Sequence, residues 1–354
     1  MYIKSLAVRD FRLYETARFE FSPQINYILG PNGSGKSTIL EALYLLMVGK
    51  SFRSTRLQEL IREGASSFYL EAVFVKYGIE QSISFLYEGT KKRILYNKRS
   101  TARLSELLGI LQGVLMVPDD IALIKGGPKE RRAYFDLQLV QLDPLYVHFL
   151  SRYQGATKQR NALLKQKSCH TIEVWEEEMA RSGAYLICRR NEAVQGLLPH
   201  ARETLSHLTG CREKLDLSYQ SQIEQPGEAQ TAGALRCRLQ QMRSRELAFG
   251  SSLVGPHKDE LIICINEKET RHYGSEGQQR SCVVALRFAE WQRAHKYSGI
   301  PPIMLIDDIG MSLDCTRMER LNNRLTDLHQ VFITTTEKRD GPFAHQITLG
   351  ARAF

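Results

Sequence analysis

The sequence predicts an α/β protein in which a mainly helical lobe is inserted into a P-loop lobe with a mixed sheet. Strand-like apolar runs lie near both ends of the chain and enclose long polar helical patterns. A glycine-rich phosphate loop separates an early buried strand from a helix, and a late apolar strand ends in two carboxylates. A chain of 354 residues is long enough for two lobes. We expect residues 1–118 and 251–354 to form the P-loop lobe, and residues 119–250 to form the insertion.

Composition fits a folded chain without a membrane span. Hydrophobic residues make up 43% and charged residues 25%, which excludes a disordered or fibrous protein. The longest apolar stretch, Ala42–Val48, is too short to cross a bilayer. Residues 1–5 lead into alternating polar and apolar positions and not into the apolar core of a signal peptide. We therefore expect a cytoplasmic protein with no membrane partner.

Charge and cysteine usage narrow the class further. The formal net charge of +9 favours a polyanionic partner, most commonly nucleic acid, although a merely soluble basic protein remains the alternative. The 7 cysteines are scattered and include no Cys-x-x-Cys, which argues against a disulfide framework or a zinc knuckle. We expect reduced thiols, most of them buried.

Periodicity places the elements of both lobes. Near the N-terminus, loosely alternating apolar residues predict two paired strands at residues 3–8 and 19–21. We expect these N-terminal strands to be antiparallel, which makes the sheet of the P-loop lobe mixed. A buried strand is expected at Ile25–Leu29 and an amphipathic helix over Thr38–Val48. The other expected strands are a hairpin of residues 70–75 and 81–86, followed by residues 261–265, 303–306 and 331–333.

The phosphate loop is an ungapped match to G-x-x-x-x-G-K-[ST]. It runs through Gly30, Pro31, Asn32, Gly33, Ser34, Gly35, Lys36 and Ser37. Its place between a strand and a helix favours triphosphate binding at a helix N-terminus over a chance glycine-rich turn. Lys36 is suited to bridge the β- and γ-phosphates, and the Ser37 hydroxyl to ligate Mg²⁺. Adenine is the default base, because the string at residues 97–100 lacks the aspartate expected for guanine recognition.

Two carboxylates follow the apolar strand Ile303–Ile306. Ligands bind beyond the carboxyl ends of parallel strands, which favours Asp307 as the Mg²⁺ residue. Asp308 is placed to orient or deprotonate an attacking water. The alternative is an ordinary Asp-Asp turn at the surface.

A second anion site is expected just before the helical segment that starts at Ser281. Ser275, Gly277 and Gln278 offer a hydroxyl and backbone N–H groups at a helix N-terminus. A dimer would explain two such sites, since this segment would cap the γ-phosphate bound by the other subunit. A capped helix after a glycine turn is the simpler alternative.

Together these motifs resemble the ATP-binding-cassette heads of the structural-maintenance-of-chromosomes superfamily. More specifically, the chain resembles the RecF family of bacterial recombination mediators over essentially its whole length. The resembling segments, in the family's order, are residues 11–14, 30–42, 49–53, 118–136, 255–260, 275–280, 305–314 and 332–336.

The resemblance implies an ABC-type P-loop ATPase head and a weak Mg²⁺-dependent ATPase that uses ATP as a binding switch. It implies that Arg12 and Thr38 join the phosphate loop in ATP binding, and that Lys36, Asp307 and Asp308 are catalytic. An ATP-dependent homodimer would close on duplex or gapped DNA, with Ser275, Gly277 and Gln278 acting in trans. RecR and RecO are the implied partners, and RecA loading in DNA replication, recombinational repair and the SOS response is the implied role.

Departures from the family pattern lie mainly near the acidic pair. Met311 and Ser312 replace the usual Ser-Glu, which puts cross-subunit coupling and the hydrolysis rate in question. Lys258 and Glu260 stand where the family tends to have Arg and Asp, and lysine cannot reproduce a bidentate arginine contact.

Basic runs are the candidate DNA contacts, because cations that neutralise phosphates give sequence-independent affinity. The first run includes Lys91, Lys92, Arg93, Lys98 and Arg99, and others span residues 152–167 and 236–245. Solvated helix faces are the alternative. Arg131 and Arg132 could serve either as DNA contacts or as structural ion-pair partners.

Two other classes of protein remain open at this point. A transporter ATPase subunit would be expected to carry a switch histidine, where this chain has the threonines of residues 334–336. A P-loop kinase would act as a monomer and would not need the segment at residues 275–280.

Overall fold

The structure is a computed structural model that describes residues 1–101, 106–308, 313–336 and 344–350. The chain forms two compact units. Unit 1 comprises Met1–Asp120, Thr204–Arg212 and Arg280–Phe354, and unit 2 comprises Ile121–Glu203 and Glu213–Gln279.

These units differ from the expected lobes in one main respect. Residues 251–279, expected in the P-loop lobe, cluster with the helical unit. The cause is strand pairing, because β10 (Glu260–Ile265) is hydrogen-bonded antiparallel to β9 (Leu215–Gln220). Strand β9 was not predicted, since the sequence on both sides of it has a polar helical pattern. This pairing fixes the first strand after the expected insertion to the insertion itself.

Unit 1 contains an antiparallel sheet with the strand order β2-β1-β4-β5-β6-β7. The predicted N-terminal strand pair and the hairpin are both present, with Val8 of β1 opposite Leu70 of β4. The strands are β1 (Tyr2–Phe11), β2 (Tyr14–Glu20), β4 (Ser67–Lys76), β5 (Ile79–Glu88), β6 (Lys91–Tyr96) and β7 (Arg99–Thr101).

The second sheet of unit 1 is parallel and has the order β14-β3-β13-β12-β8. All four residues of β12 are buried, as expected for a parallel strand covered on both faces. The strands are β3 (Ile25–Leu29), β8 (Gly113–Met116), β12 (Ile303–Ile306), β13 (Val331–Thr335) and β14 (Ala344–Thr348).

Helix α1 (Lys36–Val48) packs against strands of both sheets, including β4 and β13. Every residue from Thr38 to Val48 is buried, because the helix has a sheet on each side and not solvent on one. The far part of α8 (Glu276–Ser298) and α9 (Cys315–Leu325) bury Phe288 and Leu321 against the parallel sheet. Two short 3₁₀ turns, Leu57–Leu60 and Pro118–Ile121, complete the described regular structure of this unit.

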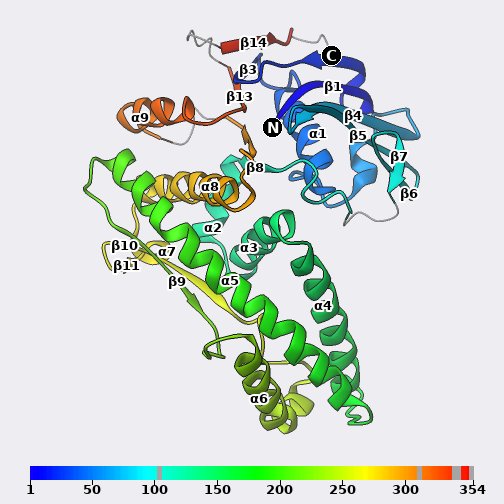
Figure 1. Ribbon diagram of the computed structural model, residues 1–354, viewed down its shortest axis with the longest axis vertical. Helices are drawn as coiled ribbons and strands as arrows, with labels where there is room; N and C mark the ends of the chain where they lie inside the picture. The colour runs from blue at the N-terminus through cyan, green and yellow to red at the C-terminus, as the bar shows by residue number, and fades with distance from the viewer. Residues whose placement is uncertain (102–105, 309–312, 337–343, 351–354) are drawn as a thin grey trace. The chain divides into compact units, whose positions relative to one another are not determined.

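Unit 2 is mainly helical, as predicted. Its helices are α2 (Ala122–Lys125), α3 (Pro128–Leu142), α4 (Pro144–Lys165), α5 (Ile172–Thr209, whose last residues belong to unit 1), α6 (Glu228–Phe249) and α7 (Thr270–Tyr273). Strands β9, β10 and β11 (Lys268–Glu269) form a small antiparallel sheet. Helices α4 and α5 lie side by side (Figure 1), joined by a fully buried ion pair of Arg160 with Glu176 at 2.9 Å.

Two further expectations concern membranes and thiols. Across the described parts of the chain, no helix combines the length and the apolar character that a membrane span requires. All 7 cysteines are free thiols. The expectation that most are buried is wrong: Cys169, Cys211, Cys237 and Cys315 are exposed, because they lie in loops or on polar helix faces.

Candidate nucleotide-binding site

The phosphate loop connects β3 to α1 and ends in a glycine that the geometry requires. Gly35 caps the helix with a φ of 100°, in the left-handed region. A Cβ added there would lie 2.6 Å from the Tyr14 hydroxyl oxygen, which leaves no room for a side chain. The sequence therefore turns sharply here and directs the first N–H groups of α1 at the loop, the arrangement that binds phosphate.

Lys36 lies over this loop. Its Nζ donates to the carbonyl oxygens of Gly30 at 2.6 Å and Pro31 at 2.9 Å. Burial lowers the pKa of Lys36, while the negative charges of Asp308 and Asp307 oppose that shift. One ammonium thus lies close to both the phosphate loop and the acidic pair.

Asp307 meets the loop at the carboxyl end of the parallel sheet. Its Oδ1 accepts a hydrogen bond from the Ser37 hydroxyl at 2.8 Å and another from the Thr334 hydroxyl at 2.6 Å. The sheet order explains this contact, because β13 lies between β3 and β12 and brings the ends of all three strands together. The structure thus joins the two predicted halves of the Mg²⁺ site.

Asp308 adopts an unusual backbone conformation beside it. Its φ is 53°, and its N–H donates to the Thr334 hydroxyl at 2.8 Å. Aspartate tolerates the left-handed region better than most residues. Thr334 therefore holds both carboxylate residues, donating to one and accepting from the backbone of the other.

These groups surround a cavity of about 180 Å³. Asn32, Gly33, Gly35, Lys36, Ser37, Thr38, Asp307 and Asp308 line it, all of them predicted site residues. Leu13, Arg53, Thr334 and Thr336 also line it and were not predicted to do so. Their only advance signal is that they fall within or beside the segments that resemble the RecF family.

The donor set fits Mg²⁺. This ion prefers hard oxygen ligands and is commonly held by one or two protein groups together with substrate phosphates and waters. The Ser37 hydroxyl and the Asp307 carboxylate supply such oxygens within hydrogen-bond distance of each other.

Arg12, a predicted ATP-binding residue, makes a different contact. Its guanidinium donates to both carboxylate oxygens of Glu41, at 3.0 and 2.8 Å, and to the Glu59 carbonyl oxygen at 3.0 Å. Glu41 is fully buried in α1, and Arg53 Nη1 lies 3.8 Å from Glu41 Oε2, the same oxygen that accepts from Arg12 Nε. Through Glu41, Arg12 is linked to Arg53, which lines the cavity. A charged residue within the apolar face of α1 is the sequence signal for this contact.

Ser275, Gly277 and Gln278 lie in unit 2, at the N-terminus of α8. The Ser275 N–H donates to Gln278 Oε1 at 2.9 Å, and the Gln278 N–H donates to the Ser275 hydroxyl oxygen at 3.3 Å. This reciprocal pair is a capping box, and Ser275 and Gly277 are exposed. The capped helix of the simpler alternative is thus present, and the exposed helix N-terminus is retained.

The first basic run forms the β6–β7 hairpin at one edge of the antiparallel sheet. Asn97 and Lys98 both have positive φ, as a two-residue hairpin turn requires. The cations of this hairpin are exposed, and none forms an ion pair among the described residues. They are Lys91, Lys92, Arg93, Lys98 and Arg99.

Several arginines among the other basic groups are engaged in ion pairs. Arg131 is buried, and its guanidinium makes two bonds to Glu260, at 2.7 and 2.8 Å. Of the two roles left open for it, the structure therefore shows the structural ion pair. Arg132 is half-buried and donates to the Asp259 carbonyl oxygen at 2.8 Å.

Glutamates of α5 pair with the two later basic runs. Arg152 pairs with Glu178, Arg236 with Glu177 at 3.1 Å, and Arg243 with Glu176 at 2.6 Å. These carboxylates neutralise the arginines, which leaves the β6–β7 hairpin as the basic run with the most available charge.

Comparisons with known proteins agree with this geometry. The model of the RecF/RecN/SMC N-terminal domain family matches residues 2–348. The DNA replication and repair protein RecF of Protochlamydia amoebophila is 46% identical over 96% of this chain and 95% of its own length. The RecF protein of Nostoc punctiforme is 36% identical over 95% of this chain and 93% of its own.

Solved structures show the same relationship. A structure of the recombination mediator protein RecF with ATPrS, described as part of the RecFOR pathway, has a TM-score of 0.90 and 31% identity over 98% of this chain and 96% of that one. An Smc head bound to a ScpA domain has a TM-score of 0.57 at 19% identity, over 95% of this chain and 90% of that one, and shares the fold. The predicted ABC-type ATPase-head fold is thus confirmed, and the chain belongs to the RecF family of DNA replication and repair proteins.

Proposed function

We propose that this chain is an ATP-dependent DNA-binding protein in which ATP binding closes a homodimer on DNA and slow hydrolysis releases it. The observation that carries the proposal is the hydrogen bond between Ser37 of the phosphate loop and Asp307 of β12. It joins a triphosphate cradle to a carboxylate with the chemistry of an ATPase site. RecF structures with ATP and with ATPrS support ATP as the nucleotide.

Four residues of the cavity have assigned tasks in this proposal: Lys36, Ser37, Asp307 and Asp308. When ATP binds, the Lys36 ammonium would contact the β- and γ-phosphates in place of the Gly30 and Pro31 carbonyl oxygens. Asp308 orients the attacking water and accepts its proton. Ser37 and Asp307 would hold Mg²⁺, which neutralises phosphate charge during transfer of the γ-phosphoryl group to water.

In this proposal the second anion site acts between two copies of the chain. Ser275, Gly277 and Gln278 of that copy would cover the γ-phosphate held by Lys36. Support comes from the exposed, capped N-terminus of α8, because helix N-termini attract anions. Two ATP molecules would then lie between two chains, and loss of the γ-phosphate would weaken the dimer.

DNA is the partner that the surface charge favours. The five exposed cations of the β6–β7 hairpin would neutralise backbone phosphates of duplex DNA near a single-strand gap. The RecFOR pathway named for the related structures supports RecO and RecR as protein partners. The proposed outcome is RecA loading on gapped DNA in the cytoplasm.

Binding of a labelled gapped duplex, followed by fluorescence anisotropy with and without ATP, tests this function. Lys36→Ala should abolish the ATP-dependent increase in affinity, and Lys50→Ala, an exposed lysine outside the cavity lining, should keep it. Replacement of the hairpin cations by glutamine should weaken DNA binding roughly tenfold or more and reduce its salt dependence. DNA affinity that is indifferent to ATP in the parent protein would contradict the proposal.

A further inference from the structure

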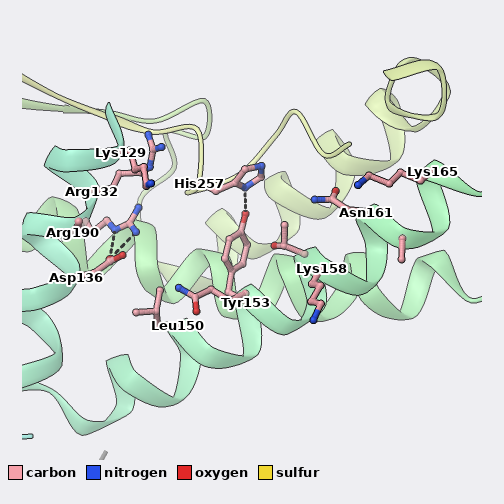
Figure 2. Close-up of a pocket in the computed structure, with 14 residues that line it drawn as sticks. Lys129, Arg132, Asp136, Leu150, Tyr153, Lys158, Asn161, Lys165, Arg190 and His257 are labelled. Atoms are coloured by element: carbon pink, nitrogen blue, oxygen red, sulfur yellow. Dashed lines mark hydrogen bonds and ion pairs between the residues drawn. The ribbon is translucent and has the colours of Figure 1, made fainter. Parts of the chain in front are cut away.

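A second and larger cavity lies within unit 2, and no residue that lines it is among those assigned above to the nucleotide. Its volume is about 790 Å³, and Figure 2 shows the side chains that line it. Faces of α3 and α4 line most of it, with Arg190 of α5 and His257 of the loop before β10. On α4 the lining positions recur every three or four residues from Leu150 to Lys165. This spacing makes a stripe roughly 22 Å long on one helix face.

The charge of this groove is strongly positive. Lys129, Arg132, Lys158, Lys165 and Arg190 are among its lining residues. The one lining carboxylate, Asp136, is paired with Arg190 at 2.8 Å (Figure 2). Lys129, Lys158 and Lys165 are exposed, and within the described ranges none of these three lysines forms an ion pair. The groove therefore offers uncompensated positive charge along its length.

The floor of the groove is neutral and fixed. Tyr153 is 3% exposed, and its hydroxyl lies 2.5 Å from His257 Nδ1 (Figure 2). His257 Nε2 lies 3.1 Å from the Ser252 carbonyl oxygen, which can only accept, so Nε2 carries the proton and Nδ1 accepts from Tyr153. Burial lowers the pKa of His257 to about 4, so the ring stays neutral near pH 7. Leu150 adds an apolar surface.

We propose that this groove binds an acidic peptide segment of a partner protein. Carboxylates of the segment would pair with Lys158 and Lys165, and an apolar side chain would contact Leu150. Ala133 and Ala162 also line the groove, and their small side chains allow a peptide backbone to approach the helices closely.

Nucleic acid fits these walls less well. Single strands are usually held by exposed aromatic rings on which the bases stack. The ring of Tyr153 is buried, and its hydroxyl is bonded to His257. A peptide needs cationic side chains, an apolar contact and nearby polar groups such as Gln154 and Asn161, all of which line the groove.

The distance between Lys158 and Lys165 determines the preferred spacing of acidic residues in the bound peptide. Lys158 and Lys165 are seven residues apart on α4, which places their Cα atoms about 10 Å apart along the helix axis. An extended peptide covers that distance in about three residues. The preferred segment thus carries acidic residues three apart with an apolar residue nearby.

A fluorescein-labelled 12-residue peptide that repeats Asp-Leu-Gly four times is a suitable probe, because its acidic residues are three apart and each is followed by a leucine. Its binding to the full chain is followed by fluorescence anisotropy. Lys158→Glu combined with Lys165→Glu should weaken binding at least tenfold, since each change turns an attraction into a repulsion. Lys268→Glu reverses an exposed lysine of β11 outside the groove and should leave binding unchanged. Thermal melts verify folding, and Lys158→Gln with Lys165→Gln replaces the reversal if it fails to fold.

The proposal is supported if the labelled peptide binds saturably, loses binding when Lys158 and Lys165 are replaced by glutamate, and is not displaced by a 12-nucleotide oligo-dT. No binding of the probe would overturn the proposal, as would equal affinity of the parent and the reversed variant. Displacement by oligo-dT, with oligo-dT binding dependent on the same two lysines, would assign the groove to nucleic acid and would also overturn it. Binding of oligo-dT that is unaffected by the reversal agrees with the proposal.

Discussion

The hydroxyl of Ser37 donates a 2.8 Å hydrogen bond to the carboxylate of Asp307, across 270 positions of sequence. The motifs assign both residues to one Mg²⁺ site, but local patterns do not show which strands bring them together, since one residue follows β3 and the other follows β12. The intervening strand β13 supplies Thr334, whose hydroxyl donates to the same carboxylate at 2.6 Å. The nucleotide site is therefore a product of strand order in the parallel sheet.

Thr334→Val tests the hydroxyl that joins the acidic pair. Valine has nearly the same shape but cannot donate to Asp307 or accept from the Asp308 N–H. Because Thr334 is buried, the orphaned N–H should lower the free energy of unfolding by about 1–3 kcal/mol, measured by urea titration. The same variant should lower kcat for ATP hydrolysis more than it raises KM. Thr334→Ser, which keeps the hydroxyl, should lie near the parent, and a valine variant with parental kcat would count against this role.

Glu41→Gln tests the buried carboxylate between Arg12 and Arg53. Removal of the buried charge leaves the partly exposed Arg12 and Arg53 uncompensated, and the expected loss of stability is about 1–3 kcal/mol. Glu20→Gln is the matched control, because Glu20 and Arg18 form an exposed pair that should contribute less than about 1 kcal/mol. Equal effects of the two substitutions on urea unfolding would show that Glu41 makes no special contribution.

His257 predicts a loss of stability in mild acid. Its pKa is near the ordinary 6.5 in the unfolded chain and about 4 in the folded one. Below pH 6.5 the unfolded chain therefore takes up a proton that the folded chain does not. Stability should fall by about 3 kcal/mol in total as the pH drops from 7 to 4, with no contribution to the slope above pH 7.

The control for this pH effect is His257→Asn, whose amide oxygen can accept from the Tyr153 hydroxyl and does not titrate. Urea unfolding of both proteins at several pH values between 4 and 8 measures the difference. The variant should show a flatter pH dependence than the parent. Parallel curves would show that His257 titrates alike in the folded and unfolded chains.

Sequence patterns predicted the parts of the nucleotide site better than their assembly. The phosphate loop and the apolar strand before Asp307 are local signals, and both lie where expected. Thr334, Arg53 and the pairing of Glu41 with Arg12 depend on which strands and helices become neighbours. Short-range periodicity does not contain that information.

The sequence did not show which of the basic residues are exposed and unpaired. Arg160 belongs to a basic run and Arg131 is a candidate DNA contact, but both are buried in ion pairs with glutamates elsewhere in the sequence. A count of cations along the chain cannot separate such arginines from the exposed cations of the β6–β7 hairpin. Strand β9 was missed for a similar reason, since its partner β10 lies beyond α6.

The central claim is that ATP joins two copies of the chain, with the loop of Lys36 on one and Ser275 on the other. The most direct measurement is the mass in solution of an Asp308→Asn variant, determined by light scattering with and without saturating ATP. This variant should bind ATP without hydrolysing it, and the account predicts monomers that become dimers when ATP is added. Ser275→Glu in the same background should prevent dimers by repelling the γ-phosphate. An Asp308→Asn protein that binds ATP but stays monomeric would contradict the account.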